Sequence, residues 1–287
     1  MKVTAKIVNA FIDNGQGGNP AGVLLEADGL TNKQKLNIAK SVGLSETAFV
    51  SKSDTADFKL DFFTSERQIA HCGHATIAVF SYLAQKGDIA KGWYSKETID
   101  GNRKILIENG KAFMEQKSPK YTAVEKYHRD VLTAIGVTEQ QLISHPQLVN
   151  TGNSFIIIGV KNKKVLSQIK PDLKAIELLS EKLDLIGFYV YTNDTNDKDS
   201  DASTRMFGPR YGIDEEAGTG MAAGPLACFL HDKMNVKKSH FSIEQGHFMP
   251  SPSASKIDIN LEINNGKIVS LMAGGMASIS GEAEVYV

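Results

Sequence analysis

The stretch that decides the fold is CGHATIAVFSYLAQK, residues 72–86, because a similar stretch returns as AGTGMAAGPLACFLH at residues 217–231. Each begins with a turn of small residues and continues as an apolar helical pattern. An aromatic residue precedes each stretch, Phe62 the first and Phe207 the second. Both pairs of positions, 62 with 207 and 72 with 217, are 145 residues apart, close to half of the 287-residue chain. These equal offsets predict two similar domains that arose by duplication.

Short β-branched or aromatic stretches, bounded by Gly, Asn, Asp or Pro, predict the strands. They lie at residues 2–11, 21–25, 47–51, 58–63, 104–108, 112–116, 155–160, 185–191, 241–244 and 257–261. Helical patterns lie at residues 31–42, 74–86, 121–135, 173–183 and 221–231. Because strands and helices do not alternate strictly, an α+β fold with largely antiparallel sheets is favoured over a doubly wound one. The polar stretch at residues 115–125 is the predicted linker.

The composition is that of a globular protein without a strongly charged partner. The chain is 41% hydrophobic and 23% charged, with 32 Lys and Arg against 33 Asp and Glu. This balance argues against binding to nucleic acid or to an anionic membrane. No segment approaches the roughly 20 apolar residues of a membrane span. Two distant cysteines form no disulfide framework and match no zinc signature, so a reducing, cytoplasmic location is expected.

An acidic loop at residues 193–201 imitates the opening of a calcium-binding loop. Ala202 replaces the glycine that such a loop requires, and Gly208 stands where the bidentate glutamate should be. A solvated hairpin tip is therefore predicted.

The two small-residue turns are candidates for ligand binding. Glycine at Gly73 and at residues 218–220 lets a ligand approach the backbone closely. The first amides of a helix lack intrahelical partners and lie at the positive end of its dipole. Two such ends facing one cleft would bind an anion. The alternative is two tight turns that need glycine for steric reasons alone.

Glu46 is the only acidic residue between Asp28 and Asp54, and it opens an apolar strand pattern. Many glutamates at such a junction are simply exposed. A glutamate sheltered by apolar neighbours would instead have a raised pKa and could exchange protons near neutral pH.

Cys72 begins a helical pattern and is flanked by His71 and His74. It could be a nucleophile, a metal ligand or a small packed residue. Metal binding is the weakest of these, because the three residues are too crowded for a tetrahedral site without distant ligands. Cys228 lies inside an apolar helical pattern and is expected in the core.

Four motifs follow one another along the chain: GGNPAGV at residues 17–23, LSETAFV at 44–50, FT at 63–64 leading to CGHAT at 72–76, and IEQG at 243–246. Together they resemble the signature segments of the phenazine-biosynthesis PhzF-like family. The resemblance runs from about residue 8 to about residue 249.

The resemblance implies the diaminopimelate epimerase fold. In that fold two similar domains are related by a pseudo-twofold duplication, and each is a mostly antiparallel curved sheet or barrel around a central helix. The active site is expected in the cleft between the domains, where the N-termini of the central helices meet. The last strand is expected to return to the first domain. The predicted domains are therefore residues 1–118 with 277–287, and residues 119–276; a homodimer is also implied.

The resemblance implies residue roles as well. Glu46 matches the family's catalytic glutamate, which takes a proton from a carbon next to an activating group and returns one elsewhere on the substrate. His74 matches the active-site histidine. Backbone amides at Gly73 and at the second turn would hold the substrate carboxylate. Further substrate contacts are expected at Asn19, Cys72, Gly220 and Met221. The resemblance implies no metal and no cofactor.

The second half departs from the family pattern. In an alignment without gaps, Glu216 replaces the usual active-site aspartate and Met221 replaces a polar side chain, so substrate specificity does not transfer. Ala217 stands where a two-thiol epimerase needs the cysteine that would act opposite Cys72. Because alanine cannot transfer a proton, diaminopimelate epimerase or proline racemase activity is disfavoured.

The sequence thus predicts a cofactor-independent isomerase that acts on a small carboxylic acid by general acid/base catalysis. Glu46 would move the proton, while His74 and Glu216 would orient the substrate or assist the transfer. The alternative is a carboxylate-binding or regulatory protein that has lost catalysis, with Met221 as part of the reason.

Overall fold

The computed structural model describes residues 2–286, and its chain forms two compact units. Unit 1 runs to Glu115 and resumes at Gly274, and unit 2 covers Gln116–Ala273. The domain boundaries expected from the sequence, after residues 118 and 276, lie three residues further along at each place.

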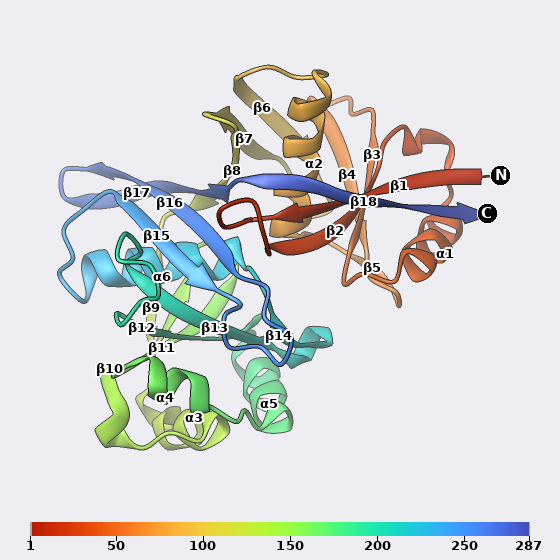
Figure 1. Ribbon diagram of the computed structural model, residues 1–287. Coiled ribbons are helices and arrows are strands. Elements are labelled where there is room, and N and C mark those ends of the chain that lie inside the picture. The colour runs from red at the N-terminus through yellow and green to blue at the C-terminus, as the bar shows by residue number, and fades with distance from the viewer. Residues whose placement is uncertain (1, 287) are drawn as a thin grey trace. The chain divides into compact units, whose positions relative to one another are not determined.

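Unit 1 is a mostly antiparallel sheet with two main helices. Its strands follow the order β18-β1-β2-β3-β4-β6-β7-β8, and the pairs β2–β3 and β4–β6 are parallel. Figure 1 shows β1 and β18 side by side, so the first and last strands of the chain form one ladder. The elements are β1 (Lys2–Ala10), β2 (Asn19–Leu24), α1 (Asn32–Val42), β3 (Thr47–Ser51), β4 (Phe58–Phe63), β5 (Gln68–Ile69), α2 (Gly73–Lys86), β6 (Gly92–Glu97), β7 (Arg103–Glu108), β8 (Lys111–Lys117) and β18 (Ala277–Tyr286).

Unit 2 repeats this plan with more helix. Its sheet follows the order β9-β10-β11-β12-β13-β15-β16, with β11–β12 and β13–β15 parallel. Its elements are β9 (Lys120–Ala123), α3 (His128–Ile135), β10 (Leu142–Asn150), β11 (Ser154–Val160), α4 (Lys163–Gln168), α5 (Leu173–Leu183), β12 (Gly187–Thr192), β13 (Ala202–Gly208), β14 (Ile213–Glu216), α6 (Gly220–Asp232), β15 (His240–Gln245), β16 (Ser255–Asn264) and β17 (Lys267–Gly275).

The two units share one order of strands and helices. In unit 1 the series β1-β2-β3-β4-β6-β7 alternates antiparallel and parallel pairings, and β10-β11-β12-β13-β15-β16 does the same in unit 2. A short strand, β5 or β14, pairs with the fourth strand of each series and precedes the long helix, α2 or α6. The predicted α+β fold with internal duplication is therefore confirmed.

The long helix of each unit is buried on nearly all sides. In α2 the residues from Gly73 to Ser81 are buried, and the helix packs against β1, β2, β3, β7 and β18. In α6 the residues from Ala222 to His231 are buried, and the helix packs against β10, β11 and β16. A helix that is apolar all round belongs in a core. The small-residue turns thus begin the central helices, which fixes the placement of His74.

The predicted helix at residues 121–135 is wrong in its first half. Residues Lys120–Ala123 form β9, which pairs with β10, and α3 begins only at His128. Pairing with a strand distant in sequence supplies backbone partners that a local pattern does not reveal. The expected linker at residues 115–125 is for the same reason mostly strand. Strands β6, β10, β13 and β17 were also missed by the sequence patterns.

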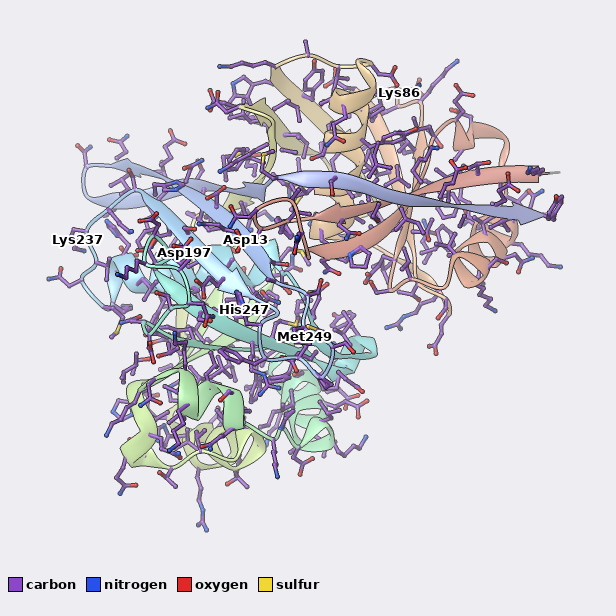
Figure 2. The ribbon with its side chains drawn as sticks, viewed as in Figure 1. Asp13, Lys86, Asp197, Lys237, His247 and Met249 are labelled. Carbon is purple, nitrogen blue, oxygen red and sulfur yellow. The ribbon has the colours of Figure 1, made fainter. Side chains whose placement is uncertain are left out.

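The acidic loop joins β12 to β13, which pair antiparallel, so the predicted hairpin is confirmed. Asp197 at its tip, labelled in Figure 2, accepts a hydrogen bond from Lys256 Nζ at 2.6 Å. Within residues 2–286, no helix has the length and apolarity to cross a bilayer.

Candidate active site

Glu46 is held at the start of a central strand of unit 1. Helix α1 ends at Gly43, whose φ of 71° is left-handed and favours glycine. The chain then turns into β3, and the carbonyl oxygen of Glu46 accepts a hydrogen bond from the Gly22 amide at 3.0 Å. The residue is only 4% exposed. Of the two alternatives, a buried and an exposed glutamate, the structure therefore confirms the buried one.

The first turn of α2 places His74 and Cys72 next to Glu46. His74 Nε2 lies 3.3 Å from Glu46 Oε2, and Cys72 Sγ lies 3.6 Å from His74 Nδ1. All three side chains are buried. Residues predicted from two motifs, LSETAFV and CGHAT, thus form one cluster, in which the imidazole lies between the carboxylate and the thiol.

Cys72 is not set up as a nucleophile. Burial raises the pKa of its thiol, and although His74 opposes this shift, the Glu46 carboxylate adds to it. Nucleophilic cysteines have lowered pKa values, because the thiolate is the reactive form. The thiol therefore stays protonated at neutral pH.

The same cluster could hold a metal ion, since the ligand atoms of Glu46, Cys72 and His74 lie within 4.8 Å of one another. Zinc binds cysteine as thiolate. The raised pKa of Cys72 works against such binding, because a proton would have to leave first.

The N-terminus of α2 lies at the turn where an anion is expected to bind. Cys72 is the N-cap residue and makes no side-chain capping hydrogen bond. The Gly73 amide therefore lies at the positive end of a 14-residue helix. Asn19 is 4% exposed and opens β2, three positions before the Gly22 amide that binds Glu46.

Behind this turn lies a lysine that the sequence patterns missed. Lys96, on β6, is fully buried. Its ammonium nitrogen donates to Thr76 Oγ1 at 2.6 Å and lies 3.3 Å from His71 Nδ1. Thr76 Oγ1 in turn donates to the carbonyl oxygen of Cys72 at 2.6 Å. Lys96 is thereby linked to the backbone of Cys72, the N-cap residue of α2.

Burial lowers the pKa of Lys96 to about 7. Burial together with the charges of Lys96 and Arg103 holds the pKa of His71 well below its usual range. His71 is therefore a neutral imidazole that can accept a hydrogen bond from Lys96. The burial of Lys96 could not be predicted from the sequence, because residues 92–97 were not predicted to form a strand.

In unit 2, Gln245 organises the turn before α6. Its Nε2 donates to the Glu216 carbonyl at 2.7 Å and to Thr219 Oγ1 at 3.0 Å, while its Oε1 accepts from the Thr219 amide at 3.1 Å. The Thr219 hydroxyl donates to the Glu216 carboxylate. Gly246 follows with φ of 83°, and a Cβ there would lie 2.1 Å from the Ser253 carbonyl oxygen. Two residues of the IEQG motif thus shape this turn: Gln245 by its hydrogen bonds and Gly246 by its left-handed backbone.

The remaining predicted residues of unit 2 lie around the same turn. The carbonyl oxygen of Gly220 accepts from Gln116 Nε2 at 2.8 Å. Met221 Sδ accepts from Asn153 Nδ2 at 3.4 Å. Ala217 is 6% exposed and precedes the N-cap residue Thr219. Gln116 and Asn153 were not predicted, since single amides carry no local signal, whereas Gln245 lies within the IEQG motif but was given no role of its own.

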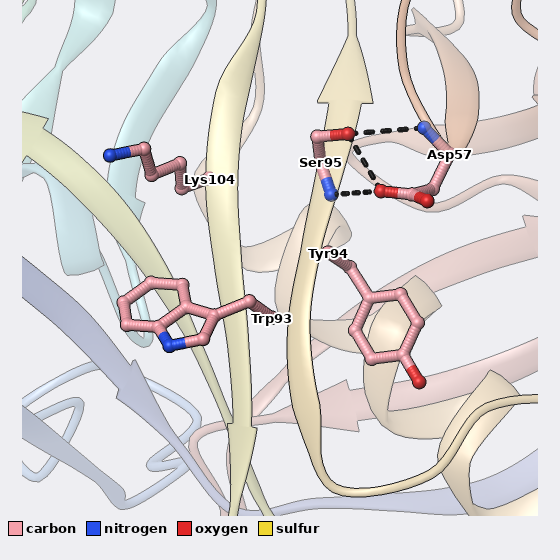
Figure 3. A pocket seen from close by; sticks show the side chains of 5 residues that line it. All are labelled: Asp57, Trp93, Tyr94, Ser95 and Lys104. Atoms are coloured by element: carbon pink, nitrogen blue, oxygen red, sulfur yellow. Dashed lines mark hydrogen bonds between the residues drawn. The ribbon is translucent and has the colours of Figure 1, made fainter.

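A hollow of about 390 Å³ lies on β6 and β7, and none of the residues that line it belongs to the Glu46, Cys72 and His74 cluster (Figure 3). It is lined by Asp57, Trp93, Tyr94, Ser95 and Lys104. Asp57 Oδ2 already accepts from the amide and hydroxyl of Ser95, both at 2.7 Å. Its carboxylate is therefore engaged within the protein.

Comparisons of the sequence and of the structure with known proteins point to the same family. A family model described as phenazine biosynthesis-like protein (PhzC-PhzF) matches residues 8–282. The chain is 31% identical over 238 residues, 80% of each chain, to the uncharacterized isomerase YddE of Escherichia coli. It is 28% identical over 228 residues, 78% of each chain, to trans-2,3-dihydro-3-hydroxyanthranilate isomerase of Pseudomonas chlororaphis. The crystal structure of a Bacillus anthracis PhzF-family protein superposes on this chain with a TM-score of 0.88 and 25% identity, and the match covers 100% of each chain.

Proposed function

The chain belongs to the phenazine biosynthesis-like (PhzC-PhzF) family, as its motifs predicted, and from this premise we propose that it is an isomerase that moves a proton on a small carboxylic acid. The reaction runs by general acid/base catalysis without a cofactor. The observation that carries this proposal is the buried pair of Glu46 and His74, with 3.3 Å between Oε2 and Nε2.

In this mechanism Glu46 takes a proton from a carbon next to an activating group and returns it to another carbon of the same molecule. A buried carboxylate suits the task, because little water competes for its proton. His74 lies close enough to steady the carboxylate or to share its proton. The relative named trans-2,3-dihydro-3-hydroxyanthranilate isomerase supports the choice of a small carboxylic acid as the substrate class.

The substrate carboxylate binds at the N-terminus of α2, where the Gly73 amide and the helix dipole favour an anion. Asn19 and Cys72 serve as further contacts. The roles expected for Glu216, Gly220 and Met221, and the homodimer, stay predictions.

Incubation in deuterated water tests the proposal. The protein is mixed with a panel of small carboxylic acids that includes trans-2,3-dihydro-3-hydroxyanthranilate, and carbon-bound deuterium is followed by NMR and mass spectrometry. We expect an isomerised acid, in which any solvent deuterium lies at the carbon that receives the proton. Binding of these acids without any exchange or isomerisation would identify a carboxylate-binding protein and overturn the proposal.

Replacement of Cys72 by alanine is expected to reduce turnover by less than about tenfold, a smaller effect than loss of a general base. The reason is that the protonated thiol contacts the substrate and His74 but does not itself move the proton. Steady-state kinetics with a responsive acid measure the effect, and isothermal titration calorimetry measures binding. Complete inactivation with unchanged binding would contradict the carboxylate mechanism and favour a thiol-based one.

A further inference from the structure

We propose that His128, Glu139 and His145 form a binding site for a divalent transition-metal ion of the Zn²⁺ type on unit 2. Each residue offers one ligand atom, and these atoms lie within 4.8 Å of one another. Two imidazoles and one carboxylate are a donor set that zinc uses with three protein ligands and an open position. None of the three takes part in the proposed isomerisation.

The backbone holds the first two ligands in defined places. His128 is the first residue of α3. Glu139 begins a 3₁₀ turn whose N-cap, Thr138, forms a capping box with Gln141; the Thr138 amide donates to Gln141 Oε1 at 2.8 Å. Both ligands therefore extend from capped or helical backbone.

The third ligand comes from an irregular stretch of strand. The register of β10 against β11 shifts between Ser144 and Gln147, and His145 lies within that shift. Strand irregularities of this kind redirect side chains and recur beside functional sites. Here the irregularity brings the His145 ring to 5.3 Å from the His128 ring, measured between centroids.

Glu139 lies between the two imidazoles. Its Oε2 is 2.6 Å from His128 Nε2, and its Oε1 is 3.4 Å from His145 Nδ1. In a tetrahedral complex with metal–ligand bonds of about 2.0 to 2.1 Å, neighbouring ligand atoms are about 3.4 Å apart. The second distance already has this value. Because a single carboxylate oxygen would bind the ion, the Glu139 side chain, which is 52% exposed, would rotate so that this one oxygen lies near both imidazoles.

A hollow of about 540 Å³ adjoins the three ligands and leaves room for water at the open position. Glu125 also lines it, and its carboxylate adds negative charge beside the ion. As ion pairs alone these exposed contacts would contribute little to stability. A divalent cation would instead use all three side chains at once.

Calorimetric titration of the full chain with Zn²⁺ tests this site. We expect one equivalent to bind to the wild type, and His145→Gln to weaken that binding by about tenfold or more. His240→Gln is the matched control, because His240 is 58% exposed, lies on β15 beside Asp258 and Asn260, and is not one of the three proposed ligands. It should bind Zn²⁺ like the wild type. Equal binding by the wild type and His145→Gln, or no binding by the wild type, would overturn the proposal.

A second measurement separates this site from the Glu46, Cys72 and His74 cluster. With Co²⁺ as the probe, a site of two imidazoles and one carboxylate gives visible d–d bands without a sulfur-to-metal charge-transfer band in the near ultraviolet. Such a spectrum, lost in His145→Gln, supports the proposal. A charge-transfer band accounting for all the bound cobalt would place the ion at Cys72 and overturn the proposal. The proposed isomerase activity would be unaffected by that result, because the incubation in deuterated water tests it separately.

Discussion

Turnover is expected to fall by a factor of about 10² to 10⁴ when Glu46 is replaced by glutamine. The amide has nearly the same shape as the carboxyl group but cannot accept the proton from the substrate carbon. The side chain is buried, and the backbone contact of residue 46 with the Gly22 amide does not depend on the carboxylate. The variant should therefore fold normally and bind substrate with nearly unchanged affinity.

The measurements for this variant are kcat, substrate binding by calorimetry, and uptake of solvent deuterium. Glu181→Gln is the matched control, because Glu181 is exposed on α5 and the chemical change is the same. It should retain wild-type turnover. Full activity in Glu46→Gln would show that another group moves the proton.

The second large effect concerns Lys96, whose replacement by methionine should stabilise the protein near neutral pH. Burial lowers the pKa of this lysine to about 7 in the fold, against its ordinary value of 10.5. Below pH 7 the folded state therefore carries the full cost of a buried charge. This cost is relieved as the pH rises toward 10.5, so the group makes the wild type more stable with increasing pH. Between pH 7 and 9 the gain is about 2 kcal/mol.

Methionine matches the length of the lysine stem and carries no charge. Replacing a buried charge with an apolar side chain is often stabilising by about 1 to 4 kcal/mol. Thr76 keeps its hydrogen bond to the Cys72 carbonyl, so the turn before α2 retains that support.

Urea unfolding at pH 7, 8 and 9 gives the free energy of unfolding for the wild type and Lys96→Met. The stability advantage of the variant should shrink by about 2 kcal/mol across this range. Lys91→Met, at a side chain that is 68% exposed, is the control and should show no such trend. A Lys96→Met protein that is less stable than the wild type at pH 7, or that keeps the wild-type slope, would contradict the assignment.

The motifs predicted the identity of the site residues better than their surroundings. Glu46, Cys72 and His74 stand in contiguous segments at the start of a strand or helix, and such starts are recognisable locally. Their mutual distances were not predictable, because they depend on α2 packing against β1, β2 and β3. The error at residues 121–135 has the same origin, since β9 exists only through its pairing with β10.

The sequence by itself determined the family, the duplicated order of strands and helices, and the glutamate proposed to move the proton. Repeats and motifs lie along the chain, so local patterns and their spacing reveal them. Only the tertiary structure decided that Cys72 stays a thiol, that Lys96 is cut off from water, and that His128, Glu139 and His145 converge. Burial and through-space distance control those properties, and both arise only after strands pair and helices pack.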